Sequence, residues 1–174
     1  KEVNDGKAGI TYDATVYTVE VEIADNGNGT LSVTATENAT KLNFTNTYAA
    51  DGSVQFGGVK TLTGKALNAN DFSFELIDES GNVIETVKNA ADGSITFSTI
   101  KYDLDDAGKT YTYTVKEVND GAAGVTYDQT VYTVEVEVKD AGDGTLTVTA
   151  TDNATKLNFT NTYAANGEVT FAGA

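Results

Sequence analysis

The chain has 174 residues and a formal net charge of −15, and it contains no His, Cys, Met, Trp or Pro. A strongly negative charge repels phosphate backbones and anionic lipid, which argues against nucleic-acid binding. The lack of His and Cys removes the commonest general base, the usual thiol nucleophile and the main zinc ligands. The composition therefore argues against a turnover enzyme, and we expect no cofactor and no metal.

The first 48 residues recur later in the chain at a shift of 115 residues. Lys1–Gly6 returns as Lys116–Gly121, and Asn38–Tyr48 returns unchanged as Asn153–Tyr163. Such self-similarity predicts a tandem repeat of about 115 residues. We expect residues 1–48 to be the C-terminal half of a preceding repeat, 49–53 a junction, 54–163 a complete unit and 164–174 the start of the next repeat.

Within residues 54–163, alternation of apolar and polar residues predicts seven or eight short strands. Turn sequences such as Ala91-Asp92-Gly93 and Asp143-Gly144 separate them, and no segment has sustained helical periodicity. This number and spacing of strands is typical of an all-β, immunoglobulin-like sandwich with two sheets around one core. The strands are expected at 54–63, 71–77, 94–99, 110–117, 131–138, 145–151 and 156–163, with a weaker one at 82–87.

Three polar residues fall in phase with the apolar core positions of these strands. They are Lys60, Glu117 and Asn161, and each should point into the core. Taken singly, such a residue is more often a strand-end residue or a satisfied buried group. Taken together, an amine, a carboxyl and a carboxamide in one apolar core would be costly unless they serve one another. Their neighbours on the same faces are Leu62, Val115 and Phe159, respectively.

Five segments carry a joint pattern in this order along the chain: Val59–Gly64, Asp71–Leu76, Tyr111–Glu117, Thr126–Asp128 and Phe159–Tyr163. Together they resemble the isopeptide-linkage domain of Gram-positive FctA-type (T-antigen) backbone pilins. The resemblance implies a CnaB-type sandwich in which a Lys on the first strand and an Asn on the last strand form an amide, assisted by a Glu from the facing sheet. By motif position these residues are Lys60, Asn161 and Glu117, and Glu2 and Asn46 are the equivalents of Glu117 and Asn161 in residues 1–48.

Burial suits these three residues to that chemistry. It lowers the pKa of a Lys toward a neutral, nucleophilic amine and raises the pKa of a Glu toward a protonated acid. We expect protonated Glu117 to donate a hydrogen bond to the Asn161 carboxamide oxygen and to shuttle protons as ammonia leaves. The rival nucleophile, Lys65, follows a turn glycine and should be solvated. Asn158 would replace Asn161 only if the last strand slipped by one residue.

These observations predict a structural stalk repeat of a bacterial surface fibre, pilus or adhesin, stabilised by a self-formed Lys-Asn amide in a single turnover. Its partners would be neighbouring repeats, with strand exchange by residues 1–48 because their apolar face lacks the early strands. The resemblance also implies an extracellular location at the bacterial cell surface. The sequence contains no membrane-spanning run and no signal peptide, so we expect the signal and anchor outside this segment.

Two alternatives remain at this stage. A ligand-binding adhesin module would need a concave aromatic or metal-bearing site. A glycosidase-like enzyme would need two acids that flank a cleft, and only Glu117 lies in a core phase. Asp25–Gly29 and Asp140–Gly144 hint at calcium loops, but they lack EF-hand spacing and are expected to be hairpin turns.

Overall fold

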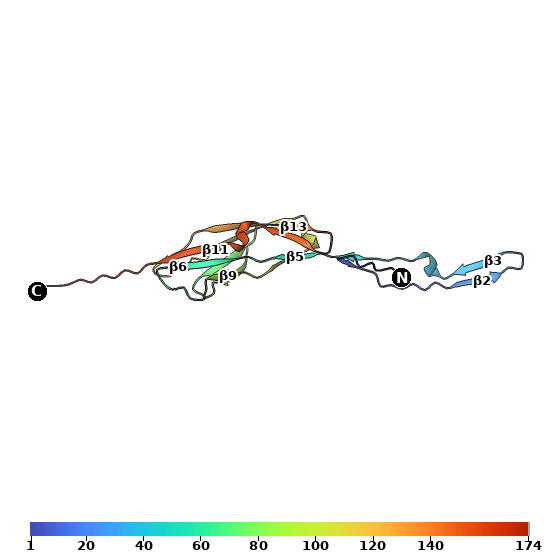
Figure 1. Cartoon of the computed structure of the whole chain (residues 1–174), viewed down its shortest axis with the longest axis horizontal. Coiled ribbons are helices and arrows are strands. Elements are labelled where there is room, and N and C mark those ends of the chain that lie inside the picture. Colours follow the sequence, from blue (N-terminus) through green and yellow to red (C-terminus); the bar gives the residue numbers. More distant parts are fainter. Residues whose placement is uncertain (174) are drawn as a thin grey trace.

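The computed structural model describes residues 1–173 and is an all-β structure with short 3-10 helices (Figure 1). Two main sheets face each other in the central part of the chain. The five-stranded sheet has the order β14 (Leu146–Ala150), β13 (Val131–Asp140), β11 (Thr110–Glu117), β7 (Ser73–Ile77) and β8 (Val83–Lys88). The four-stranded sheet has the order β12 (Val125–Thr126), β15 (Phe159–Tyr163), β6 (Gly57–Thr63) and β9 (Ser94–Thr96).

Shorter elements complete this sandwich. Strand β5 (Asp51–Val54) pairs antiparallel with β10 (Ile100–Asp103), and the 3-10 helices η2 (Leu104–Asp106) and η3 (Asp152–Thr155) lie in the connections. The core between the sheets is closely packed because alternate residues of each strand point inward. Its fully buried side chains include Phe74, Val115, Val134, Val136 and Val138 from one sheet and Ile95 and Phe159 from the other.

The first and last strands of the four-stranded sheet along the chain, β6 and β15, lie side by side and run parallel. Their register sets Lys60 opposite Phe159, and Leu62 opposite Asn161. Lys60 is also held from the other side, where its backbone N–H donates to the carbonyl oxygen of Gly93 at 2.7 Å. Gly93 has φ +87°, and a Cβ there would lie 2.4 Å from the Lys60 carbonyl oxygen, so only glycine allows this close approach.

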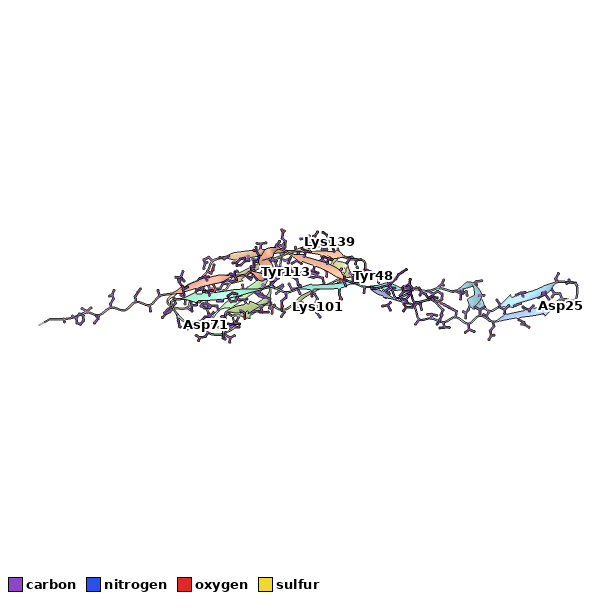
Figure 2. The ribbon with its side chains drawn as sticks, in the orientation of Figure 1. Asp25, Tyr48, Asp71, Lys101, Tyr113 and Lys139 are labelled. Atoms are coloured by element: carbon purple, nitrogen blue, oxygen red, sulfur yellow. The ribbon has the colours of Figure 1, made fainter. Side chains whose placement is uncertain are left out.

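The N-terminal segment (residues 1–48) projects from one end of the sandwich as a thin ribbon (Figures 1 and 2). It contains β1 (Ile10–Thr11), β2 (Val21–Asp25), β3 (Leu31–Ala35), η1 (Glu37–Thr40) and β4 (Thr47–Tyr48). Strands β1 and β4 pair with each other, and β2 and β3 form a hairpin. Val21 is 55 % exposed, whereas Val136, which occupies the same place in the repeated sequence, is fully buried. The two copies of the repeated sequence therefore differ in burial. Strands from residues 51–103 cover residues 116–163, and they do not cover residues 1–48.

Several expected strand ends are shifted by one to three residues, and three larger differences remain. The strand predicted at 54–63 is interrupted at Gln55 and Phe56, since Phe56 turns into the core and its carbonyl accepts from Phe97 N–H. The chain therefore contributes β5 to one pair and β6 to another sheet. Strands β10 and β12 were not predicted, because two to four residues are too few for a periodic signal. Among residues 1–173, no helix is long and apolar enough to cross a membrane.

Substitution of Val136 and Val21 tests this unequal burial with matched residues. Val136→Ala should lower the free energy of unfolding by about 2 kcal/mol, because two buried methyl groups and their packing are lost. Val21→Ala should change it by less than about 0.5 kcal/mol. Urea unfolding of both variants measures this difference, and equal destabilisation would contradict the exposed position of Val21.

Candidate functional site

Lys60, Glu117 and Asn161 meet in the core between the two main sheets. Lys60 and Asn161 come from the adjacent strands β6 and β15, and Glu117 is the last residue of β11 in the facing sheet. Lys60 is 2 % exposed, Glu117 is 8 % exposed and Asn161 is 0 % exposed. The parallel register brings the two partners within reach, because the long Lys side chain extends diagonally toward the Asn two positions along the neighbouring strand.

One carboxylate oxygen joins the three side chains. Glu117 Oε1 lies 2.6 Å from Lys60 Nζ and accepts a hydrogen bond from Asn161 Nδ2 at 2.8 Å. The Lys60 contact has ion-pair distance without hydrogen-bond geometry, so Nζ has no acceptor among the described residues, and Glu117 Oε2 has no donor there either. Such unsatisfied buried atoms are rare in folded proteins and are a reason to look for chemistry.

The Asn161 carboxamide is held at both ends. Its Oδ1 accepts a hydrogen bond from the backbone N–H of Asp128 at 2.8 Å. The Asp128 side chain fixes that backbone by accepting from Thr130 N–H at 2.8 Å and from Thr160 N–H at 2.7 Å. A backbone N–H only donates, so it must face the carboxamide oxygen. Our expectation that Glu117 bonds to this oxygen is therefore wrong: Glu117 contacts the nitrogen, and Asp128 N–H contacts the oxygen.

Burial shifts the pKa values of the amine and the acid toward their neutral forms. Desolvation lowers the pKa of Lys60, and the attraction of Glu117 opposes this only in part. Desolvation likewise raises the pKa of Glu117 against the opposing effects of Lys60 and Asn161. Phe72 and Phe74 form the apolar wall, with ring centroids 4.6 and 5.9 Å from Lys60 Nζ. A neutral amine beside a protonated acid is the pair that acyl transfer needs.

Asn89 shows how a structural buried polar group differs from this site. Asn89 is 1 % exposed, and sequence periodicity did not single it out. Its Oδ1 accepts from Phe72 N–H at 2.9 Å, and its Nδ2 donates to the carbonyl oxygens of Asn68 and Ala90 at 2.8 and 2.9 Å. Every polar atom of its side chain is satisfied, so Asn89 anchors a loop and leaves nothing unpaired.

The two rival residues lie outside the core. Lys65 is exposed and its Nζ lies 5.3 Å from the centroid of the Tyr163 ring. Asn158 is exposed, while its neighbours Leu157 and Phe159 are fully buried. The last strand has therefore not slipped, and Asn161 keeps the inward position.

The N-terminal segment contains the same arrangement without a lysine. Asn46 Nδ2 donates to Glu2 Oε1 at 2.7 Å, and Asn46 Oδ1 accepts from Asp13 N–H at 2.8 Å. Asp13 accepts from Thr15 N–H at 2.8 Å and Thr45 N–H at 2.9 Å, as Asp128 does from Thr130 and Thr160. The Glu-Asn-Asp arrangement thus forms in both places, with and without a covering half.

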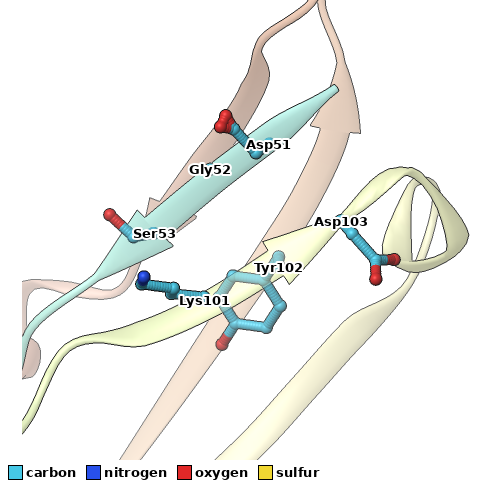
Figure 3. A pocket seen from close by; sticks show the side chains of 6 residues that line it. All are labelled: Asp51, Gly52, Ser53, Lys101, Tyr102 and Asp103. Atoms are coloured by element: carbon cyan, nitrogen blue, oxygen red, sulfur yellow. The ribbon is translucent and has the colours of Figure 1, made fainter. Parts of the chain in front are cut away.

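A surface hollow lies over the β5–β10 pair (Figure 3). The Tyr102 hydroxyl is engaged with that of Tyr113 at 2.9 Å, and Asp103 caps η2 by accepting from Asp105 N–H at 2.9 Å. Two of its polar groups are thus already engaged within the chain, and the hollow lies on paired strands rather than on loops. The residues that line it are Asp51, Gly52, Ser53, Lys101, Tyr102 and Asp103.

The sequence matches the family described as Spy0128-like isopeptide containing domain (FctA) over residues 1–49 and 56–164. The chain belongs to this family. The family description agrees with the resemblance found in the sequence, and the match includes both Glu-Asn pairs. A search of curated proteins gives no match.

Solved structures that resemble the chain include two pilus proteins. The major pilin T-13 of Streptococcus pyogenes is 17 % identical with a TM-score of 0.41, covering 66 % of this chain and 53 % of that protein. The C-terminal fragment of the pilus adhesin SpaC of Lactobacillus rhamnosus GG is 15 % identical with a TM-score of 0.38, covering 92 % and 61 %. The chain thus spans little more than half the length of either.

Removal of the amine tests the raised pKa of Glu117. In Lys60→Met, folded Glu117 should keep its proton at pH values where the unfolded chain has lost it, above its ordinary pKa of 4.5. Stability should therefore be greatest below that pH and fall as pH rises, by up to about 1.4 kcal/mol per unit. Urea unfolding from pH 4 to 8 measures the slope. The double variant Lys60→Met/Glu117→Gln should lack it, and a parallel slope in both proteins would contradict the prediction.

Proposed function

We propose that the chain is part of the stalk of a bacterial surface fibre, pilus or adhesin, and that residues 54–163 are hardened by a self-formed amide between Lys60 Nζ and Asn161 Cγ. The observation that carries this proposal is the contact of one buried carboxylate oxygen with both reacting side chains. Membership of the isopeptide-containing family supports it. By the same reasoning the protein is displayed outside the cell. Residues 54–163 are one complete repeating unit, and residues 1–48 are the C-terminal half of a preceding one.

The proposed reaction needs only groups already in the core. Neutral Lys60 Nζ attacks Asn161 Cγ; the Nζ–Cγ bond forms and the Cγ–Nδ2 bond breaks. The proton that Nζ loses passes through Glu117 to Nδ2, which leaves as ammonia. Glu117 Oε1 is suited to this transfer because it contacts both nitrogens. The fold holds the partners together, so the bimolecular step becomes intramolecular.

The backbone N–H of Asp128 would stabilise the negative charge that develops on Asn161 Oδ1. It already lies at hydrogen-bond distance from that oxygen, 2.8 Å, before any reaction. Preorganised donors of this kind cost no reorganisation as the tetrahedral intermediate forms. Asp128 would thus act through its backbone, with its side chain as the brace that positions it.

The position of the amide explains its mechanical value. A pull on the two ends of residues 54–163 loads β6 and β15 in shear, because these strands are parallel neighbours. A bond between them passes the force directly from one strand to the other. Without it, the roughly 100 residues between Lys60 and Asn161 would extend by about 350 Å. By analogy with a disulfide, closing such a loop also adds up to about 4.7 kcal/mol of stability.

Intact mass tests the proposal on the chain as it exists. The mass should be lower than that of the sequence by one ammonia, and peptide mapping should join Lys60 to Asn161. Glu117→Ala should fold without losing ammonia, because proton transfer is removed. Lys60→Ala should also keep the full mass, while the matched control Lys65→Ala should react normally. A wild-type mass equal to the sequence, or full crosslinking in Glu117→Ala, would refute the assignment.

Residues 1–48 should keep an unreacted Asn46, since the only lysine at the period-matched position of this chain is Lys60. Their apolar residues, among them Ile23 and Val33 at 62 % and 64 % exposed, are suited to covering by strands of another copy. Peptide mapping should therefore recover Asn46 as a free carboxamide. A Lys60-Asn46 crosslink between chains, or loss of a second ammonia, would contradict this and would show that the N-terminal segment captures the nucleophile.

A further inference from the structure

The joint between the N-terminal segment and the sandwich is built around one tyrosine. The Tyr48 hydroxyl donates to Asp140 Oδ1 at 2.7 Å and accepts from Gly144 N–H at 3.2 Å. Asp140 and Gly144 lie at the tip of the β13–β14 hairpin. The hydrogen bond to Asp140 also raises the pKa of Tyr48, as expected for a hydroxyl that donates to a carboxylate. Figure 2 labels Tyr48 at this joint.

Close backbone contact completes the joint. A Cβ on Gly9 would lie 2.6 Å from Gly144 Cα, which is closer than van der Waals contact allows. The two backbones can therefore approach this closely only because position 9 has no side chain. Asp51, just after the joint, forms a parallel bridge with Thr145 of the same hairpin. We call the receiving surface, formed by Tyr48, Gly9 and Ala49, the seat, and the hairpin loop Asp140–Gly144 the tip.

A second seat exists at Tyr163. Tyr163 and Val125 pair as Tyr48 and Ile10 do. Ala164 N–H donates to the carbonyl oxygen of Gly124 at 2.9 Å, the same bond as that from Ala49 N–H to the carbonyl oxygen of Gly9, also at 2.9 Å. The same backbone is therefore built at both places. Within residues 1–173, the Tyr163 hydroxyl forms no hydrogen bond, in contrast to that of Tyr48.

A second tip exists at the opposite end of the chain. The β2–β3 loop, Asp25–Gly29, folds like Asp140–Gly144: Gly27 N–H donates to Asp25 Oδ1 at 2.8 Å, and Gly142 N–H donates to Asp140 Oδ1 at 2.8 Å. Figure 1 shows the β2–β3 loop at one extreme of the molecule and the C-terminus at the other. The chain thus carries an open seat and an open tip that face away from each other.

We propose that the seat at Tyr163 and Gly124 binds the Asp25–Gly29 tip of a second copy of this chain, in the geometry already present at Tyr48. The Tyr163 hydroxyl would donate to Asp25, and Gly29 N–H would donate to the hydroxyl. Asn166, which follows this seat as Asp51 follows the first, would lie beside Thr30. Lys65, whose Nζ is 5.3 Å from the Tyr163 ring centroid, adds a positive charge where the Asp25 carboxylate would arrive.

The two surfaces differ from each other and point in opposite directions, so the contact is heterologous and does not close into a ring. Copies of the chain would assemble head to tail into straight filaments. Contact through so small an area is weak between separate molecules. When consecutive repeats belong to one chain, the seat of one repeat meets the tip of the next at a high effective concentration, so the same contact is mostly formed. The same joint would therefore set the angle between successive units of an array.

Complementation between two variants of the 174-residue chain tests the proposal. Tyr163→Phe removes the hydroxyl of the seat and leaves the tip intact, and Asp25→Asn weakens the tip and leaves the seat intact. Sedimentation velocity at increasing concentration, in enough salt to screen the net charge of −15, should show chain-like association of the wild type. Each variant alone should sediment as a monomer. Their mixture should form dimers and nothing longer, because only one competent seat and tip remain per pair.

Site-directed crosslinking detects the same contact without requiring a stable complex, because a covalent bond captures even short-lived encounters. The chain has no Cys, so Ala123→Cys beside the seat and Asn28→Cys in the tip are unique labels. A short bismaleimide should join a chain carrying the first to a chain carrying the second, and the matched control Ser80→Cys, in the β7–β8 turn, should give no dimer with the Ala123→Cys chain. Equal yields from tip and control, or a wild type that neither associates nor crosslinks through the tip, would overturn the proposal. These readouts do not depend on the Lys60-Asn161 amide.

Discussion

Sharing one buried carboxylate oxygen between an amine and a carboxamide is the constraint on which the rest of this structure depends. An amine and an acid cannot be placed in an apolar core without a large desolvation cost, and a buried ion pair alone often fails to offset it. The facing sheets must therefore bring Lys60, Glu117 and Asn161 together within hydrogen-bond distance. Conversion of the amine to an amide would leave a group that cannot be protonated, so the proposed reaction relieves the cost that the fold imposes.

The site is assembled from two unequal parts. The Glu, the Asn and the bracing Asp lie within 44 residues of one another along the chain, and their contacts form both in the sandwich and in the uncovered N-terminal segment. The lysine comes from a distant strand, which also brings the apolar cover. Local structure therefore prepares the acceptor, and only the completed core supplies the nucleophile together with the low dielectric that makes it neutral.

Different elements resist tension and set the angle between the N-terminal segment and the sandwich. The parallel neighbours β6 and β15 would carry tension, because they are the first and last strands of the four-stranded sheet along the chain. The N-terminal end of β6 and the C-terminal end of β15 therefore lie at opposite ends of the pair. The contact of Tyr48 with Asp140 and Gly144 fixes how the N-terminal segment meets the sandwich. A fibre needs both properties, since a unit that resists extension still gives a flexible chain if its joints turn freely.

The sequence by itself determined the all-β class, most of the longer strands and the inward phase of Lys60, Glu117 and Asn161, because alternation with period two records which face of a strand is buried. It did not determine which carboxamide atom meets Glu117, the brace formed by Asp128, or the satisfied Asn89, because these depend on backbone groups brought together by loops. It also missed the break at Gln55 and Phe56 and the role of Tyr48. Tyr48 and Tyr163 end the same eleven-residue sequence, yet among residues 1–173 only Tyr48 has a hairpin tip bound to it. Residues distant in the chain make that difference, so only the tertiary structure decided it.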